Sequence, residues 1–191
     1  LAIGTLLGLP IAGAWLSGAL AAAALHWCAR AVLPGPYALI PVAMFVLTQL
    51  ITSTWVSSYW GGLVTFLGGS LVLGFLLRSQ SSELTARAFI LAGTGAGILA
   101  LSRPFEGLLL CTLGAAVFLR PLLITLREMG SRTLLVRVSL AAGMVAVALA
   151  FQGALNHAVT GSVLRMPFSV FHEQYLSVPL FLWQDPTTFL H

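Results

Sequence analysis

Hydrophobic residues fill most of the chain in long blocks that short polar turns interrupt. The blocks do not alternate between apolar and polar positions, so they favour helices over strands. Several of them approach the roughly 20 residues that a helix needs to cross a bilayer. The predicted spans are Ile11–Trp27, Tyr37–Val56, Gly61–Leu77, two short arms within Ala88–Leu119, and Val138–Asn156. The pattern predicts an all-α, polytopic transmembrane helical bundle of about six spans, two of them short.

Composition strengthens this prediction. Hydrophobic residues make up 59% of the chain and charged residues 7%, whereas a soluble domain carries about 25% charged residues. Such a chain could not cover its surface in water, and we expect membrane lipid around it. The nine basic residues are all arginine and are scattered along the sequence. They therefore do not predict a nucleic-acid site, and they suit the basic loops that orient a membrane protein.

The positions of the arginines predict an orientation in the membrane. If the links Arg78–Arg87 and Arg120–Arg137 are cytoplasmic, seven arginines fall on the cytoplasmic side and two on the other. The seven are Arg30, Arg78, Arg87, Arg120, Arg127, Arg132 and Arg137, and the two are Arg103 and Arg165. This bias requires Ala88–Leu119 to cross twice, as a hairpin that turns at the sequence SRPFEG, Ser102–Gly107. The sequence SSYWGG, Ser57–Gly62, then lies on the extracytoplasmic side with the hairpin turn.

The end of the chain differs from the apolar part. We expect residues 1–156 to form the transmembrane core and residues 157–191 to begin an extracytoplasmic segment. Within that segment we expect aromatic side chains to pack against the outer ends of the helices, as part of the roof of a cleft. These are Phe168, Phe171, Tyr175, Phe181 and Trp183. The chain begins without Met and stops within a loop, so we expect an internal part of a longer protein, incomplete at both ends.

The pair Arg103 and Glu106 stands out because charged residues are so rare here. Pro104 suits the first position of a helix, and Glu106 would then lie in the first turn, beside the positive end of the helix dipole. Arg103 and Glu106 are three positions apart and can pair. One hypothesis is that Arg103 contacts a phosphate or pyrophosphate and Glu106 holds it in place. The other is that the ion pair only caps a short helix, and the sequence leaves both open.

Other candidates have simple alternatives. Tyr59 and Trp60 could stack on a sugar or a lipid head group, or belong to an interfacial aromatic belt. His172 beside Glu173 could serve acid–base chemistry or a metal, or lie in an ordinary solvated loop. Two ligand types without a third are a weak metal signal, so no dedicated metal site is predicted.

The glycines of the apolar blocks predict close helix packing. Gly93 and Gly97 lie inside an apolar span with no strand before them, which disfavours a nucleotide loop. We interpret them as a small-xxx-small helix contact. The same interpretation holds for a second group: Gly61, Gly62, Gly68, Gly69 and Gly74.

Three stretches resemble a known family. They are SSYWGGLVTFLGGSLVLGFLLR, GILALSRPFEGLLL and NHAVTGSVLRMPFSVFHEQYLSVPLFLWQ. They resemble bacterial multi-pass proteins related to the GT-C glycosyltransferases, distant relatives of protein O-mannosyltransferases and lipid A aminoarabinose transferases. The resemblance covers about Leu1 to Gln184. It implies sugar transfer from a polyprenyl-phosphate donor on the extracytoplasmic face of the bacterial inner membrane, with Arg103 a candidate for the donor phosphate.

One departure from the family limits what the resemblance implies. GT-C enzymes carry a catalytic acid in the first extracytoplasmic loop, but this chain has no Asp or Glu before Glu83. We expect the acid in the missing N-terminal part, and no residue here is assigned its role. Some GT-C enzymes use a divalent metal and others do not, so the resemblance leaves the cofactor open. The alternative function is non-enzymatic: a transporter, flippase or assembly partner for envelope glycan or lipid.

Overall fold

The computed structural model describes residues 8–51, 62–81 and 84–175. Every regular element within these ranges is a helix, and no strand occurs in them. The predicted all-α class is therefore confirmed for this part of the chain. The chain divides into two compact units, Leu1–Ala148 and Leu149–His191, and each is described by itself.

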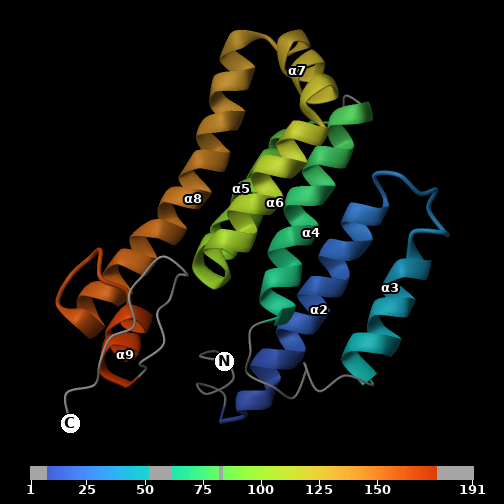
Figure 1. Cartoon of the computed structure of the whole chain (residues 1–191). Helices are drawn as coiled ribbons and strands as arrows, with labels where there is room; N and C mark the ends of the chain where they lie inside the picture. Colours follow the sequence, from blue (N-terminus) through green and yellow to red (C-terminus); the bar gives the residue numbers. More distant parts are fainter. Residues whose placement is uncertain (1–7, 52–61, 82–83, 176–191) are drawn as a thin grey trace. The chain divides into compact units, whose positions relative to one another are not determined.

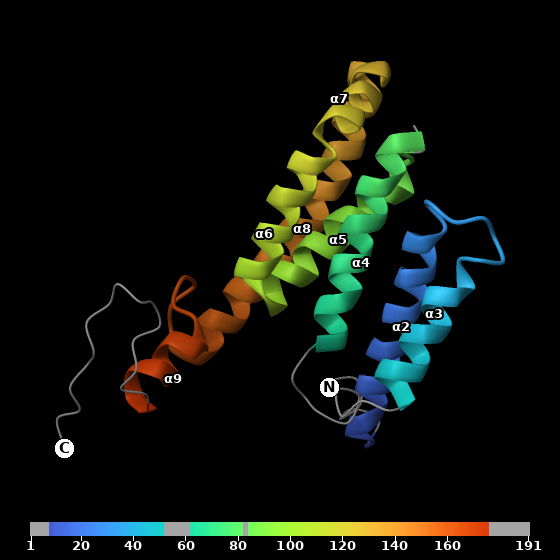
Figure 2. The ribbon, with the colours of Figure 1, turned by 45° about the vertical axis from the view of Figure 1, so that its right-hand side comes forward.

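The first unit holds most of the helices (Figures 1 and 2). Its elements are α2 (Pro10–Ala29), α3 (Leu39–Phe45) with a π-helical continuation (Val46–Ile51), α4 (Gly62–Arg78), a 3₁₀ turn (Ser79–Ser81), α5 (Ala86–Ser102), α6 (Pro104–Val117), α7 (Leu119–Glu128) and the first part of α8 (Ser131–Thr160). Helix α4 packs against both α2 and α5, and α5 packs against α6. The second unit holds the end of α8 and α9 (Pro167–Tyr175).

The helices of the first unit gather arginines at one end. Helices α2 and α4 end there, α5 and α8 begin there, and α7 lies there, as Figure 1 shows. These positions carry Arg30, Arg78, Arg87, Arg120, Arg127, Arg132 and Arg137. We call this the arginine-rich end. The turn at Arg103 lies at the opposite end, so the structure separates the arginines of this unit as the sequence predicted.

Fewer helices than predicted are long enough to cross a bilayer. Within the described residues, the segments Ile11–Ala29 and Ser131–Thr160 meet the length and hydropathy that a span needs. Helices α6 and α7 would make a third span together, although they are bent by 74° at the break between them. Helices α4 and α5 have 17 residues each, which is about 25 Å against a core of about 30 Å. The structure thus gives two or three candidate spans, and a six-span bundle is not confirmed.

The predicted basic link Arg120–Arg137 is largely helical. This stretch forms α7 and the first turns of α8, with a break at Met129 and Gly130. Its arginines made it look like a polar connection, but aliphatic residues between them supply a helical face. Thr125 is buried on one side of α7, where its Oγ1 donates to the carbonyl of Ser79 at 2.9 Å.

Two arginines at the arginine-rich end form hydrogen bonds to backbone carbonyls. The guanidinium of Arg78 donates to the carbonyl oxygens of Trp27 at 2.6 Å and Gly74 at 3.0 Å, and it lies 3.9 Å from the centre of a Trp27 ring. Arg137 donates to the carbonyl oxygen of Leu84 at 2.6 Å. Hydrogen bonds from charged groups are stronger than neutral ones, so both arginines stabilise the helix ends that they join.

The predicted packing role of the glycines is confirmed where the structure describes it. A Cβ on Gly68 would lie 2.9 Å from the carbonyl oxygen of Gly95, so α4 and α5 meet backbone to backbone. A Cβ on Gly93 would collide with the backbone of Ala141 in α8, and one on Gly97 would lie 2.9 Å from the Ala148 Cβ. Small residues let membrane helices approach closely and gain dispersion energy, and α5 uses both of its faces in this way.

Hydrogen bonds fix the turn between α8 and α9 in the second unit. Asn156 is buried, and its Nδ2 donates to the carbonyl of Val163 at 2.9 Å. Gly161 follows α8 with a φ of +74°, a left-handed conformation that glycine adopts without strain at a helix end. The chain then begins α9, which contains His172 and Glu173. Their backbone is therefore helical, and the interpretation of these residues as part of a loop is wrong.

Candidate functional site

The turn between α5 and α6 is made by one residue. Arg103 both ends α5 and precedes α6, with φ −147° and ψ 76°. Its N–H donates to the carbonyl of Leu99 and its own carbonyl accepts from the N–H of Gly107, both at 2.8 Å. Pro104 disfavours a helical conformation at Arg103 and then starts α6 well, because the N–H that it lacks would have no partner there. The predicted turn at SRPFEG is confirmed, and the crossing of the membrane by its two arms stays a prediction.

Gly107 allows the hairpin to close tightly. It is buried, and a Cβ at this position would lie 2.7 Å from the Cβ of Leu99. A larger residue would push α6 away from α5 and move the turn. The sequence around Arg103 therefore fixes the backbone that presents its side chain.

The predicted ion pair of Arg103 and Glu106 is confirmed. Arg103 Nη1 donates to Glu106 Oε1 at 2.9 Å, and the two side chains are 44% and 59% exposed. An exposed pair of this kind contributes little to stability. A guanidinium carries five N–H donors, so this bond leaves donors on Arg103 for a further acceptor. We call Arg103 and Glu106 the turn site.

Two hydroxyls beside the turn site were not predicted. Thr65 Oγ1 of α4 donates to Ser102 Oγ at 3.3 Å, and Ser102 Oγ donates to the carbonyl of Ile98 at 2.8 Å. Thr65 and Ser102 are 37 positions apart, so no spacing in the sequence pointed to their contact. They join the start of α4 to the end of α5 and so support the turn.

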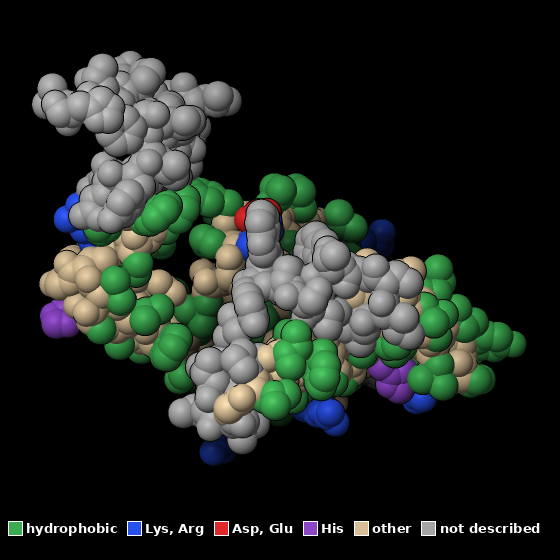
Figure 3. Space-filling view, turned by 90° about the horizontal axis from the view of Figure 1, so that it is seen from below, with side chains coloured by type: hydrophobic (Ala, Val, Ile, Leu, Met, Phe, Trp, Pro, Cys, Tyr) green, Lys and Arg blue, Asp and Glu red, His purple; other side chains and the backbone are tan. Residues whose placement is uncertain are grey.

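Apolar side chains surround the turn site. Phe105 is 68% exposed and Leu108 64%, and among the described residues Figure 3, which looks at the molecule from below, shows many hydrophobic side chains and one small acidic patch. Exposed apolar surface of this extent is typical of a lipid-facing helix. A half-exposed guanidinium at the end of such helices suits an anionic oxygen at the membrane surface.

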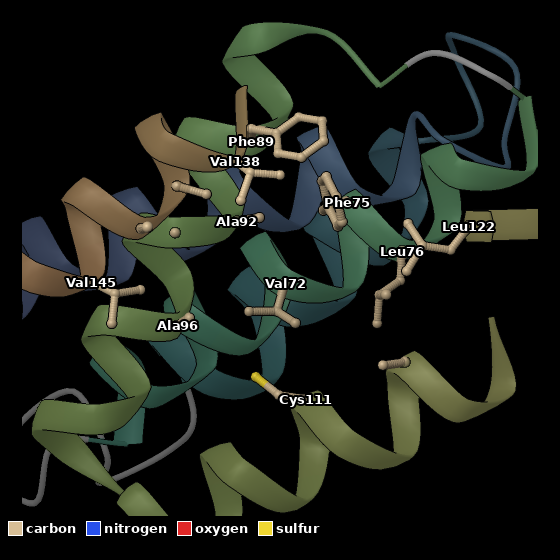
Figure 4. A pocket seen from close by; sticks show the side chains of 14 residues that line it. Val72, Phe75, Leu76, Phe89, Ala92, Ala96, Cys111, Leu122, Val138 and Val145 are labelled. Carbon is tan, nitrogen blue, oxygen red and sulfur yellow. The ribbon is translucent and has the colours of Figure 1, made fainter. Parts of the chain in front are cut away.

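The first unit also contains a cavity of about 350 Å³. It lies among α4, α5, α6, α7 and the first part of α8, and Figure 4 shows the side chains that line it. They are aliphatic and aromatic, including Val72, Phe89, Leu122 and Val145, and the thiol of Cys111 is the heteroatom among them. This lining can hold hydrocarbon but has no group for acid–base chemistry, so we do not place a reaction here.

Several predicted site residues lie outside what the structure describes. Tyr59 and Trp60 fall in the range 52–61. His172 and Glu173 belong to α9, but the positions of their side chains are outside the described part. Of the predicted cleft roof, Phe168 and Phe171 are more than half exposed, and the remaining aromatics are not described. In the described ranges, no three His, Cys, Asp or Glu side chains form a group that could hold a metal ion.

Comparisons with models of known protein families, with curated proteins and with solved structures find no match to this chain.

Cysteine labelling tests whether α6 and α7 cross the membrane. In a chain with Cys28→Ala and Cys111→Ala, we expect Phe105→Cys to react with an impermeant maleimide on intact spheroplasts. Gly130→Cys, which lies between α7 and α8 at an exposed position, should react only after the membrane is opened. Reaction of both cysteines from the same side would show that the bent pair α6 and α7 is a re-entrant loop, and this result would refute the predicted topology.

Proposed function

We propose that this is an integral membrane protein that binds a lipid-linked phosphate at the turn site. We further propose that it is the donor-binding part of a GT-C-like glycosyltransferase, which takes a sugar from a polyprenyl-phosphate donor on the extracytoplasmic face of the bacterial cytoplasmic membrane. The observation that carries the proposal is the half-exposed guanidinium of Arg103, paired with Glu106 at the turn between α5 and α6. The resemblance of the sequence to GT-C proteins supports the choice of donor.

The geometry suits a phosphate in two ways. Arginine presents parallel N–H donors that match two phosphate oxygens, and the bond to Glu106 orients the guanidinium before the ligand arrives. The surrounding apolar surface of α6 offers a place for the first part of a polyprenyl chain. In the transfer, a hydroxyl oxygen of the acceptor bonds to the anomeric carbon and gives up its proton to a base outside the described residues. The bond between the anomeric carbon and the phosphate oxygen breaks, and polyprenyl phosphate leaves with added negative charge. A guanidinium at this position would offset that charge.

The position of the turn site agrees with the proposed side of the membrane. It lies at the end of the first unit opposite the arginine-rich end, and the excess of arginine marks the cytoplasmic side of membrane proteins. A donor phosphate at Arg103 would then face the extracytoplasmic surface. The proposal gives this chain the role of holding the donor and assigns no catalytic acid to the described residues.

Ligand binding tests the proposal. We expect the chain in neutral nanodiscs to bind polyprenyl phosphate at least tenfold more tightly than polyprenol of the same chain length, because one charge-assisted contact is worth about 1.5–3 kcal/mol. Native mass spectrometry or tryptophan fluorescence would report the two affinities. Equal affinity for the two lipids, or binding of neither, would contradict recognition of the phosphate.

A further inference from the structure

The outward face of α7 combines two arginines with aliphatic side chains. Arg120, Leu123, Ile124 and Arg127 are spaced at i, i+3, i+4 and i+7, which places them on one face of the helix. All four line one open groove of about 490 Å³, to which Val117 of α6 also contributes. Leu123 and Ile124 are 42% and 48% exposed. We call these four residues the α7 stripe.

Contacts on its other face hold α7 in this orientation. The hydroxyl of Thr125 is bonded to the carbonyl of Ser79, and Leu122 lines the apolar cavity of the first unit. The break near Phe118 turns α7 by 74° from α6. If α6 runs across the bilayer, α7 therefore lies near the membrane plane, at the arginine-rich end of the unit (Figure 1).

The two arginines of the α7 stripe differ in their contacts from the arginines that bond to the backbone or to an acid. Within the described residues, Arg78 and Arg137 bond to backbone carbonyls and Arg103 bonds to Glu106, whereas Arg120 and Arg127 have neither a hydrogen bond nor an ion pair. Glu128 is the acidic residue nearest to them in sequence, and it points about 100° away from Arg127 around the helix. The stripe thus carries two positive charges over an apolar surface, without an acid to neutralise them.

We propose that the α7 stripe binds anionic phospholipid. The guanidinium groups of Arg120 and Arg127 would contact the phosphate in the negatively charged head group. Leu123 and Ile124 would lie against the part of the acyl chains that is next to the head group. Charge complementarity favours this occupant over a zwitterionic lipid, whose net charge is zero. An interfacial helix with a basic and an apolar surface is also the form that binds to anionic membranes. This inference does not depend on the proposed donor site, which lies at the other end of the unit.

A double substitution tests the α7 stripe. We expect Arg120→Gln with Arg127→Gln to weaken binding of phosphatidylglycerol about 30-fold, because each arginine near an anionic surface contributes about 1 kcal/mol. The measurement is native mass spectrometry of the chain from nanodiscs of phosphatidylcholine with added phosphatidylglycerol. Arg120→Lys with Arg127→Lys should retain most of the binding, since the charges remain.

The matched control is Arg87→Gln with Arg132→Gln. These arginines are exposed at the same end of the unit and have no hydrogen bond or ion pair within the described residues. The control should keep most of its phosphatidylglycerol binding. An equal loss in both double variants would show that net charge alone attracts the lipid, and an unchanged α7 variant would also overturn the proposal. So would a change of oligomeric state in the α7 variant with unchanged lipid binding, because the stripe would then contact a second copy.

A measurement on the unchanged chain covers the case in which the α7 variant does not fold. Bound phosphatidylglycerol should fall as salt is raised, because exposed charges are screened within about a nanometre. Binding that does not respond to salt would contradict an electrostatic site on the α7 stripe.

Discussion

Gly93→Ala should lower the free energy of unfolding by roughly 1–3 kcal/mol, the usual cost of forcing a methyl group into a packed interface. The new Cβ would collide with the backbone of Ala141 rather than with a flexible side chain, so we expect the upper part of this range. Helices α5 and α8 would have to move apart, which loses contacts along their whole interface. Unfolding in mixed micelles with added denaturing detergent, followed by circular dichroism, measures the change.

Gly143→Ala is the matched control for this prediction. Gly143 lies in α8, and a Cβ there would have nothing within 4 Å. The same substitution should stabilise the helix by up to about 1 kcal/mol, because alanine is a better helix former than glycine. If the two variants have the same stability, the close approach of α5 and α8 does not exist in the protein.

The hairpin turn could be predicted because its determinants are local. Pro104 and Glu106 lie within one turn of Arg103, and each has a preference that sequence alone reveals: proline at a helix start and an acid in the first turn. The ion pair follows from the same spacing. The close contact of Gly107 with Leu99 was not predicted. The contact of Thr65 with Ser102 could not be predicted, because it depends on how α4 packs against α5.

Helix length and the identity of α7 were predicted less well. The expected span Gly61–Leu77 is close to α4, but the expected span Val138–Asn156 is only part of α8, which runs from Ser131 to Thr160 because the residues before Val138 are also helical. Between Arg120 and Arg137, the arginines suggested a polar link, while the spacing of Leu122 and Thr125 supplied an inward helical face that the prediction overlooked.

Arg103→Lys should weaken binding of polyprenyl phosphate about tenfold, although it keeps the positive charge. Lysine lacks the planar pair of donors that matches two phosphate oxygens. Glu106→Gln should have a smaller effect, because it removes an orienting partner and leaves the cation. Neither change should alter the free energy of unfolding appreciably, since the ion pair is exposed. A large loss of stability in both variants would instead make the pair a structural cap.

The most direct test of the donor site is the ratio of affinities for polyprenyl phosphate and polyprenol in Arg103→Ala. The matched control is Arg87→Ala, an exposed arginine at the opposite end of the same unit. Loss of one charge-assisted contact should lower the ratio roughly 10- to 100-fold in Arg103→Ala and leave it unchanged in Arg87→Ala. A folded Arg103→Ala variant that keeps the ratio of the unchanged chain would contradict phosphate binding at the turn site.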